Sequence, residues 1–136
     1  MSQCRSRSSI LLVEDNNHIR EALQCLLEGE GYLVRLASNG QEALEVLASN
    51  SLPDLILLNL EMPIMDGFQF REVQKQDPKI ASIPVILMSA ADPPLIQEGL
   101  RRAQFQAYLL MPTDLGALLV VIKRLLHCPP SGRSSV

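Results

Sequence analysis

The stretch "PDLILLNLEMPIMDG", Pro53–Gly67, decides the fold that the sequence predicts. It begins with a continuous apolar run, which is typical of a strand covered on both faces within a parallel sheet. The run ends at Asn59 and leads into a loop that closes on Asp66-Gly67, a turn that caps the next helix. Parallel sheets bind ligands beyond the carboxyl ends of their strands, so the chemistry available at Asn59 is the central question.

Similar apolar runs alternate with helical patterns along the whole chain. The predicted strands cover residues 10–13, 32–37, 54–59, 84–89 and 107–110. The predicted helices cover residues 19–27, 38–50, 66–76, 95–102 and 115–126. Arg35 in the second strand suggests partial exposure and therefore an edge position. Five strands alternating with five helices predict an α/β fold, a doubly wound parallel sheet with helices on both faces.

Length and composition predict one cytoplasmic domain. The 136 residues suffice for a single core, at 8–126, and residues 1–7 and 127–136 resemble flexible tails. The net charge of −3 gives no general attraction to nucleic acid or to acidic membranes. No apolar run reaches the roughly 20 residues of a membrane span, and no signal peptide is visible. The three cysteines lack metal-type spacing, which favours reduced thiols.

The residues that follow the predicted strands select among ligands. A dinucleotide site needs a G-x-G-x-x-G loop after the first strand, and a triphosphate site needs a glycine-rich loop with lysine. The first loop carries instead two adjacent carboxylates, which repel phosphate and attract a hard cation such as magnesium. The sequence therefore does not predict nucleotide binding there. The candidate pocket residues are Glu14, Asp15, Asn59, Ser89, Met111 and Pro112.

Four motifs carry a resemblance to a known family. The segments "LLVEDN", "DLILLNLEMPIMDG", "IPVILMSA" and "AYLLMPTD" occur in the order and at the spacing of a response-regulator receiver domain. Together they are specific, and the chain resembles that family from about Ser8 to Leu126. The resemblance implies a flavodoxin-like, five-stranded parallel sheet in the order 2-1-3-4-5, flanked by five helices.

The resemblance also implies the roles of the pocket residues. In the family, an acidic pair holds magnesium, and Glu14 and Asp15 match it. The third strand ends on an aspartate that accepts a phosphoryl group, a position occupied here by Asn59. A lysine before a proline pairs with that group, and here Met111 precedes Pro112. The sequence therefore keeps the frame of the site and lacks two of its reactive groups.

Two further positions match the family's switch. A hydroxyl residue at the end of the fourth strand hydrogen-bonds the phosphoryl oxygen, which corresponds to Ser89, and an aromatic residue that changes rotamer corresponds to Tyr108. A plain strand-end hydroxyl and a simply buried tyrosine are equally consistent with the sequence. The chain departs from the family at Gln104 and Phe105, where Gly-Ala is usual. We expect Phe105 either to fill the core or to form an exposed contact.

The two lost groups predict a degenerate receiver. A carboxamide at position 59 cannot act as the nucleophile that forms an acyl phosphate, and a thioether at position 111 supplies no cation. Three carboxylates with one lysine carry a charge of −2, and so do the carboxylates of Glu14 and Asp15 alone, so losing both groups keeps the balance. A weak magnesium site that includes Asn59 and a carbonyl near Glu61 remains open, as does an empty, hydrated pair of carboxylates. No cofactor is required.

The function predicted is therefore a pseudo-receiver in two-component or phosphorelay signalling. We expect no enzyme activity, no phosphorylation at Asn59 and no direct binding of nucleic acid. The expected partner is a protein, either a histidine kinase, an output domain or a second copy in a homodimer, bound through the fourth helix, fifth strand and fifth helix. The alternative is a small metal- or ligand-binding enzyme or carrier that uses Glu14 and Asp15. A longer gene product with an output domain is a further alternative.

Overall fold

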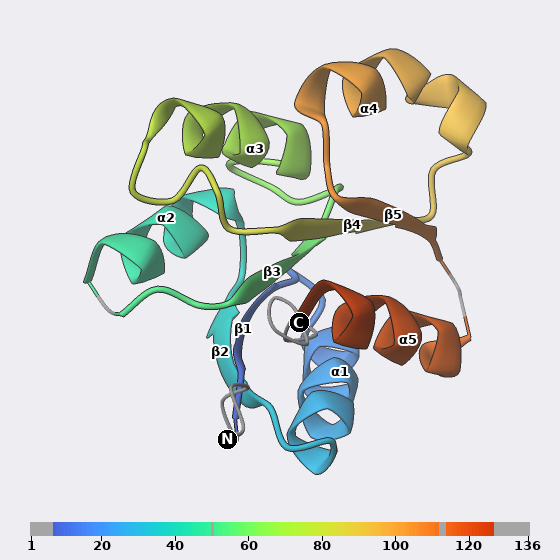
Figure 1. Ribbon diagram of the computed structural model, residues 1–136. Helices are drawn as coiled ribbons and strands as arrows, with labels where there is room; N and C mark the ends of the chain where they lie inside the picture. Colours follow the sequence, from blue (N-terminus) through green and yellow to red (C-terminus); the bar gives the residue numbers. More distant parts are fainter. Residues whose placement is uncertain (1–6, 50, 112–113, 127–136) are drawn as a thin grey trace, which may run out of the picture.

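The computed structural model describes residues 7–49, 51–111 and 114–126, and shows a parallel sheet between two layers of helices (Figure 1). The predicted tail residues 1–6 and 127–136, together with Pro112, lie outside the described residues. The strands are β1 (Ser9–Val13), β2 (Leu33–Ala37), β3 (Leu55–Asn59), β4 (Val85–Ser89) and β5 (Ala107–Leu110). The helices are α1 (Asn17–Gly29), α2 (Gly40–Ser49), α3 (Gly67–Gln76), α4 (Gln97–Ala103) and α5 (Leu115–Leu126).

All neighbouring strands pair in parallel, in the order β2-β1-β3-β4-β5. This order confirms the predicted fold, and β2 lies at the edge that Arg35 suggested. The order reverses between β1 and β3, since the chain winds outward to β2 on one side and to β4 and β5 on the other. The carboxyl ends of β1 and β3 therefore form the crevice in which such sheets bind ligands.

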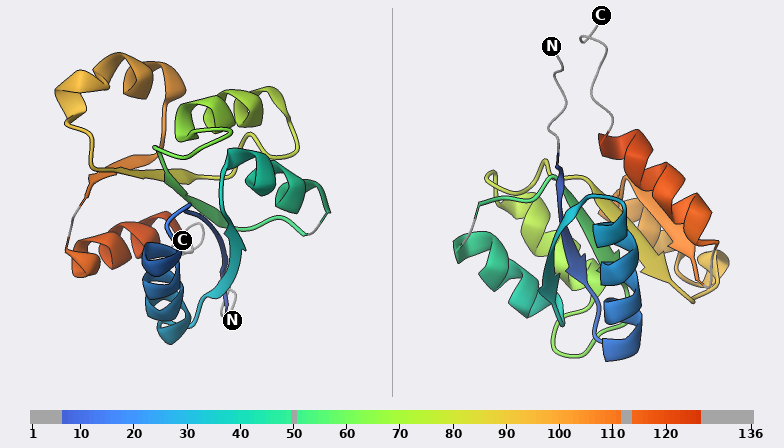
Figure 2. Two further views of the ribbon diagram at one scale, coloured as in Figure 1. Left: turned by 180° about the vertical axis from the view of Figure 1, so that it is seen from behind. Right: turned by 90° about the horizontal axis from the view of Figure 1, so that it is seen from below.

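Each face of the sheet buries its own set of apolar side chains. Alternate residues of one strand point to opposite faces, so Leu11 and Val13 contact one cluster while Ile10 and Leu12 contact the other. The first cluster lies under α2, α3 and α4, and the second lies under α1 and α5. Figure 2 shows these two groups of helices on opposite sides of the sheet. This double burial explains the continuous apolar runs of the central strands.

The start of one helix differs from the sequence prediction, which placed it at Leu95. Pro93–Leu95 forms a separate 3₁₀ turn, and α4 begins at Gln97. The last helix has the predicted bounds, Leu115–Leu126. The last helix buries Leu118 and Ile122 completely, but Leu115 in its first turn is 46% exposed. The apolar face of α5 is therefore only partly covered by the sheet.

No helix in the described part of the chain is both long and apolar enough to cross a membrane.

Candidate functional site at the carboxyl edge of the sheet

The acidic corner, as we call Glu14, Asp15 and Asn59, forms where β1 and β3 end side by side. Glu14 directly follows β1, and Asn59 is the last residue of β3, two strands that pair through Val13 and Leu58. Glu14 is only 5% exposed, whereas Asp15 reaches solvent and Asn59 is half-buried. The sheet therefore brings together the three residues that the sequence proposed as metal ligands.

The side-chain amide of Asn59 lies between three oxygen atoms. Its Nδ2 donates to Glu14 Oε2 at 3.3 Å, to Asp15 Oδ1 at 3.2 Å and to the carbonyl of Glu61 at 3.0 Å. A magnesium site at this point would need the amide oxygen in place of the nitrogen, one of the two alternatives that the sequence left open. Three acceptors surround the two hydrogens of the amide nitrogen, so the N–H end of the amide faces them.

Glu14 is a weaker acid than an ordinary glutamate. Its pKa is raised from 4.5 to about 7, mainly by burial and also by a hydrogen bond with the neighbouring Asp15 carboxyl and repulsion from it. The backbone N–H of Asn16, which donates to Glu14 Oε2 at 3.0 Å, and the charge of Arg20 act in the opposite direction. Glu14 therefore keeps its proton to a higher pH than an exposed glutamate does.

A second set of hydrogen bonds continues from the corner to β5. The hydroxyl of Ser89, at the end of β4, donates to Glu61 Oε2 at 2.8 Å and accepts from the N–H of Ala91 at 2.9 Å. The hydroxyl of Tyr108 donates to the carbonyl of Ala91 at 2.6 Å, and burial raises the pKa of Tyr108. Glu61 therefore contacts Asn59 through its carbonyl and Ser89 through its carboxylate.

The contact between the Glu61 carboxylate and Ser89 was not predicted from the sequence, which suggested a role only for a backbone carbonyl near Glu61. A glutamate in an exposed loop gives no pattern that tells which hydroxyl it binds. Its position two residues after Asn59 was the only available signal.

Met111 occupies the position where the family has lysine. Its side chain is half-buried and packs with the apolar cluster under α1 and α5. Its thioether carries no charge, so it contributes packing and no electrostatic neutralisation.

The donor set of the acidic corner suits a hard cation only in part. Two carboxylates and one carbonyl are oxygen ligands of the kind that magnesium prefers. An open depression of about 570 Å³ is lined by Asp15, Glu61 and Asp66 among others, whereas Glu14 and Asn59 do not line it. The Asn59 amide would have to turn its oxygen inward to join them. Within the described residues, no three His, Cys, Asp or Glu side chains are grouped as a metal site requires.

Comparison with known proteins decides the family. The family model of the response regulator receiver domain matches residues 10–123, which include every described strand except the first residue of β1. The chain belongs to the response regulator receiver domain family. This receiver domain is thus a signalling module of two-component systems.

Curated relatives support this assignment at moderate identity. The receiver domain is 33% identical to an uncharacterised 14.6 kDa protein of Leptolyngbya boryana over 94% of this chain and 98% of that protein. It is 32% identical to the polar-differentiation response regulator DivK of Brucella anthropi over 85% of this chain and 93% of DivK. It is 34% identical to the response regulator Rre1 of Synechocystis over 87% of this chain but only 51% of Rre1.

Solved structures agree with the described fold. The receiver domain of a signal transduction histidine kinase from Syntrophus aciditrophicus is 33% identical and gives a TM-score of 0.83, with 88% of this chain and 89% of that chain covered. The receiver domain of a sensor histidine kinase from Pseudomonas aeruginosa is 25% identical, with a TM-score of 0.80 and coverage of 88% and 97%. That second structure has a magnesium ion coordinated in its active-site cleft.

Proposed function

We propose that this receiver domain acts in two-component or phosphorelay signalling as a phosphorylation-independent protein-interaction module. The observation that carries the proposal is the Asn59 amide, which occupies the phosphoacceptor position and donates to Glu14, Asp15 and the Glu61 carbonyl. A carboxamide is neutral, and its nitrogen lone pair is delocalised, so it offers no nucleophile to a phosphoryl donor. The amide here serves as a hydrogen-bond donor to the carboxylates of the acidic corner.

The position of Met111 supports the same proposal. Transfer of a phosphoryl group needs a cation that stabilises charge on the transferred oxygens. The family supplies that cation with a lysine at this position, whereas Met111 packs into the apolar cluster under α1 and α5. Restoring only the carboxylate at position 59 would therefore leave the reaction without this stabilisation.

The contact of Glu61 with Ser89 indicates how a fixed conformation is held. In the family, the hydroxyl at the Ser89 position binds a phosphoryl oxygen, and here it donates to a carboxylate oxygen of Glu61. Both acceptors are anionic oxygens. Tyr108 is at the same time held by the Ala91 carbonyl, two residues after Ser89. We propose that these contacts keep the switch in one arrangement without phosphate.

Magnesium is a weak ligand of this receiver domain in our proposal. The cation would have to displace both the Asn59 amide nitrogen and the proton on Glu14, and it would gain two carboxylates instead of three. We therefore expect binding in the millimolar range, with no role in function.

The proposed partner surface consists of α4, β5 and α5. Several large apolar side chains on or beside these elements are exposed: Leu95 is 81% exposed, Val120 56%, and Leu110 and Leu115 each 46%. Exposed apolar side chains on these elements are available to contact a partner protein. The partner would be a histidine kinase, an output domain or a second copy of this chain.

Incubation with acetyl phosphate and magnesium tests the proposal. The native chain should show no added phosphoryl group by intact-mass spectrometry, and beryllofluoride should leave its ¹H–¹⁵N spectrum unchanged. The double variant Asn59→Asp, Met111→Lys is the positive control, and the single variant Met111→Lys is the matched negative control. An acid-stable, hydroxylamine-labile adduct on the native chain would refute the proposal.

A further inference from the structure

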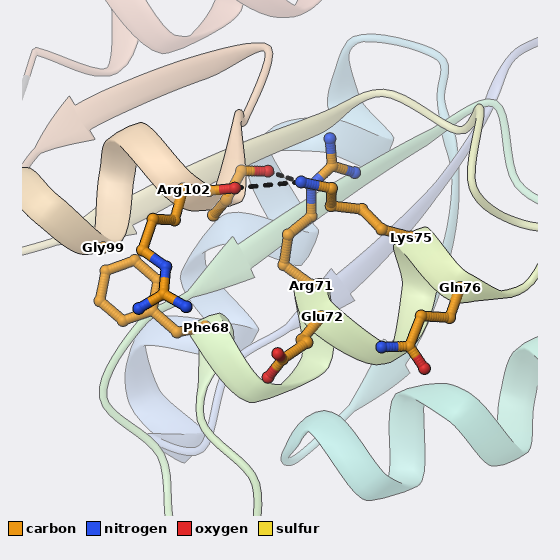
Figure 3. A pocket seen from close by; sticks show the side chains of 8 residues that line it. Phe68, Arg71, Glu72, Lys75, Gln76, Gly99 and Arg102 are labelled. Atoms are coloured by element: carbon orange, nitrogen blue, oxygen red, sulfur yellow. Dashed lines mark hydrogen bonds between the residues drawn. The ribbon is translucent and has the colours of Figure 1, made fainter.

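A cleft between α3 and α4 contains no residue of the acidic corner, and the function proposed above assigns no ligand to it. It encloses about 500 Å³ and is lined by residues of both helices, among them Phe68, Arg71 and Lys75 of α3 and Gly99 and Arg102 of α4 (Figure 3). Pockets for small organic ligands typically have volumes of a few hundred Å³ and combine an apolar wall with a few polar groups. The cleft meets this description, and its charge narrows the class of ligand.

The lining of the cleft is positively charged although the chain is acidic. The charged residues that line the cleft are three cations, Arg71, Lys75 and Arg102, and one carboxylate, that of Glu72. The whole chain, in contrast, has a net charge of −3. Glu72 is exposed, and within the described residues it makes no ion pair with any of the three cations. The cleft therefore has an excess of positive charge that a ligand could neutralise.

Arg71 is the most constrained of these cations. It is only 4% exposed, and its guanidinium donates to the carbonyls of Ala103 and Gln104 at 2.9 and 2.8 Å and to the Gln74 side chain at 2.7 Å. All three acceptors are neutral, and burial lowers the pKa of Arg71. A buried cation without a negative partner is costly, and two of its five N–H groups remain after these bonds.

Lys75 and Arg102 add donors at the more open side of the cleft. Lys75 Nζ donates to the Arg102 carbonyl at 3.0 Å and to Gln104 Oε1 at 3.3 Å, which leaves one N–H. In the described part of the chain, the Arg102 guanidinium has neither a hydrogen bond nor an ion pair. Its neighbour Arg101 differs, since it pairs with Glu98 at 2.6 Å and does not line the cleft.

Phe68 provides the apolar wall, and Gly99 determines its position. A Cβ atom at Gly99 would lie 2.6 Å from the Phe68 ring, so only glycine lets the ring approach the α4 backbone this closely. The ring also lies 6.2 Å from the ring of Phe105, over which Arg71 stacks at 5.6 Å. Phe105 is half-buried and packs against the apolar cluster under α2, α3 and α4, beside Phe68 and Arg71.

We infer that the α3–α4 cleft binds a small organic oxyanion, with its carboxylate or phosphate group bonded to the Arg102 guanidinium, which lies beside Phe68 (Figure 3), and attracted by the positive charge of Lys75 and Arg71. The apolar part of the ligand would lie against Phe68. Such a ligand supplies the negative charge that Arg71 lacks inside the protein. It would also bridge α3 to α4, the first element of the proposed partner surface.

A ¹H–¹⁵N NMR titration at constant ionic strength in sodium chloride tests this inference. The probes are phenyl phosphate, phenylacetate and the neutral benzyl alcohol. We expect saturable shifts for at least one of the two anions, centred on the amides of 68–76 and 99–104, and none for benzyl alcohol. The stronger of the two anions identifies the head group. Absence of saturable shifts with both anions, or shifts spread over the whole chain, would overturn the inference.

Two variants and one matched control distinguish a site from general attraction. Arg102→Gln should weaken the binding of the better anion roughly tenfold, the expected effect of one charge-assisted hydrogen bond. Lys75→Gln keeps a donor for the Arg102 carbonyl and should weaken binding to a similar extent. Arg101→Gln removes the same charge from the same helix outside the cleft and should change the affinity by less than about twofold. Equal losses in all three variants would refute a specific site.

Discussion

The raised pKa of Glu14 predicts that the receiver domain becomes less stable as pH rises towards neutrality. The native state holds a proton on Glu14 up to a pKa of about 7, whereas the unfolded chain releases it near 4.5. Between these values the native state binds more protons than the unfolded state, so raising the pH favours unfolding. The replacement Glu14→Gln should remove this dependence, because glutamine imitates the protonated acid at every pH.

The expected magnitude follows from the two pKa values. One pH unit within the window changes the free energy of unfolding by about 1.4 kcal/mol per proton, and the window spans about 2.5 units. The native chain should therefore lose about 3 kcal/mol between about pH 4.5 and about pH 7 relative to the variant. The glutamine oxygen can still accept from Asn16 and Asn59, and its amide can donate to Asp15, so the local hydrogen bonds are kept.

Urea unfolding followed by circular dichroism, from about pH 5 to about pH 8, measures the difference. The two free-energy curves should lie close together at the acidic end, with Glu14→Gln more stable at the alkaline end. The exposed Glu21 on α1 provides a control, since Glu21→Gln makes the same chemical change outside the corner and should follow the native curve. Parallel curves for the native chain and Glu14→Gln would show that Glu14 is not held protonated.

Three other perturbations address separate contacts. Asn59→Asp adds a third carboxylate to the acidic corner and should lower the free energy of unfolding by roughly 2 kcal/mol at neutral pH, a loss that magnesium chloride reverses in urea titrations. If that variant is as stable as the native chain without magnesium, the Asn59 amide does not stabilise the carboxylates of the acidic corner. Arg71→Met leaves two carbonyls at the end of α4 without donors and should lower the free energy of unfolding by about 3 kcal/mol. Amide exchange in α4 should become faster, which hydrogen-exchange mass spectrometry detects. Unchanged exchange in α4 would contradict this. In protein labelled with 3-fluorotyrosine, Glu61→Ala should shift the ¹⁹F signal of Tyr108 and spare that of Tyr32, and a fixed Tyr108 signal would show that Glu61 does not position the switch.

The fold could be predicted from the sequence because both of its determinants are patterns along the chain. Strands buried on both faces require continuous apolar runs such as Ile10–Val13. The end of each run predicts which residue lies at the carboxyl edge of the sheet. Parallel pairing then follows from the alternation with helices. The first residue of α4 was harder to predict from the sequence. Two consecutive prolines are compatible with the first turn of a helix and also with the separate 3₁₀ turn that is observed.

The site could be predicted only in part, since its chemistry depends on orientation. The sequence placed Asn59 beside the acidic pair, but it could not tell which end of the amide faces the carboxylates. Nor could it pair Glu61 with Ser89, because a loop side chain chooses its partner in three dimensions. Arg71 is a similar case. The sequence pattern of a short polar helix suggests an exposed arginine, but the side chain is buried against the end of α4.

The orientation of Asn59 changes the electrostatic interpretation of the two lost groups. Counting charges along the sequence gives −2 whether the aspartate and lysine are both present or both absent. In the structure, a proton on Glu14 lowers the negative charge of the corner, and the neutral Asn59 amide stabilises the carboxylates by hydrogen bonds without changing that charge. A corner stabilised in this way has less to gain from a bound cation. Any signal that reaches this receiver domain should therefore enter at its surface, through a protein partner or through the cleft between α3 and α4.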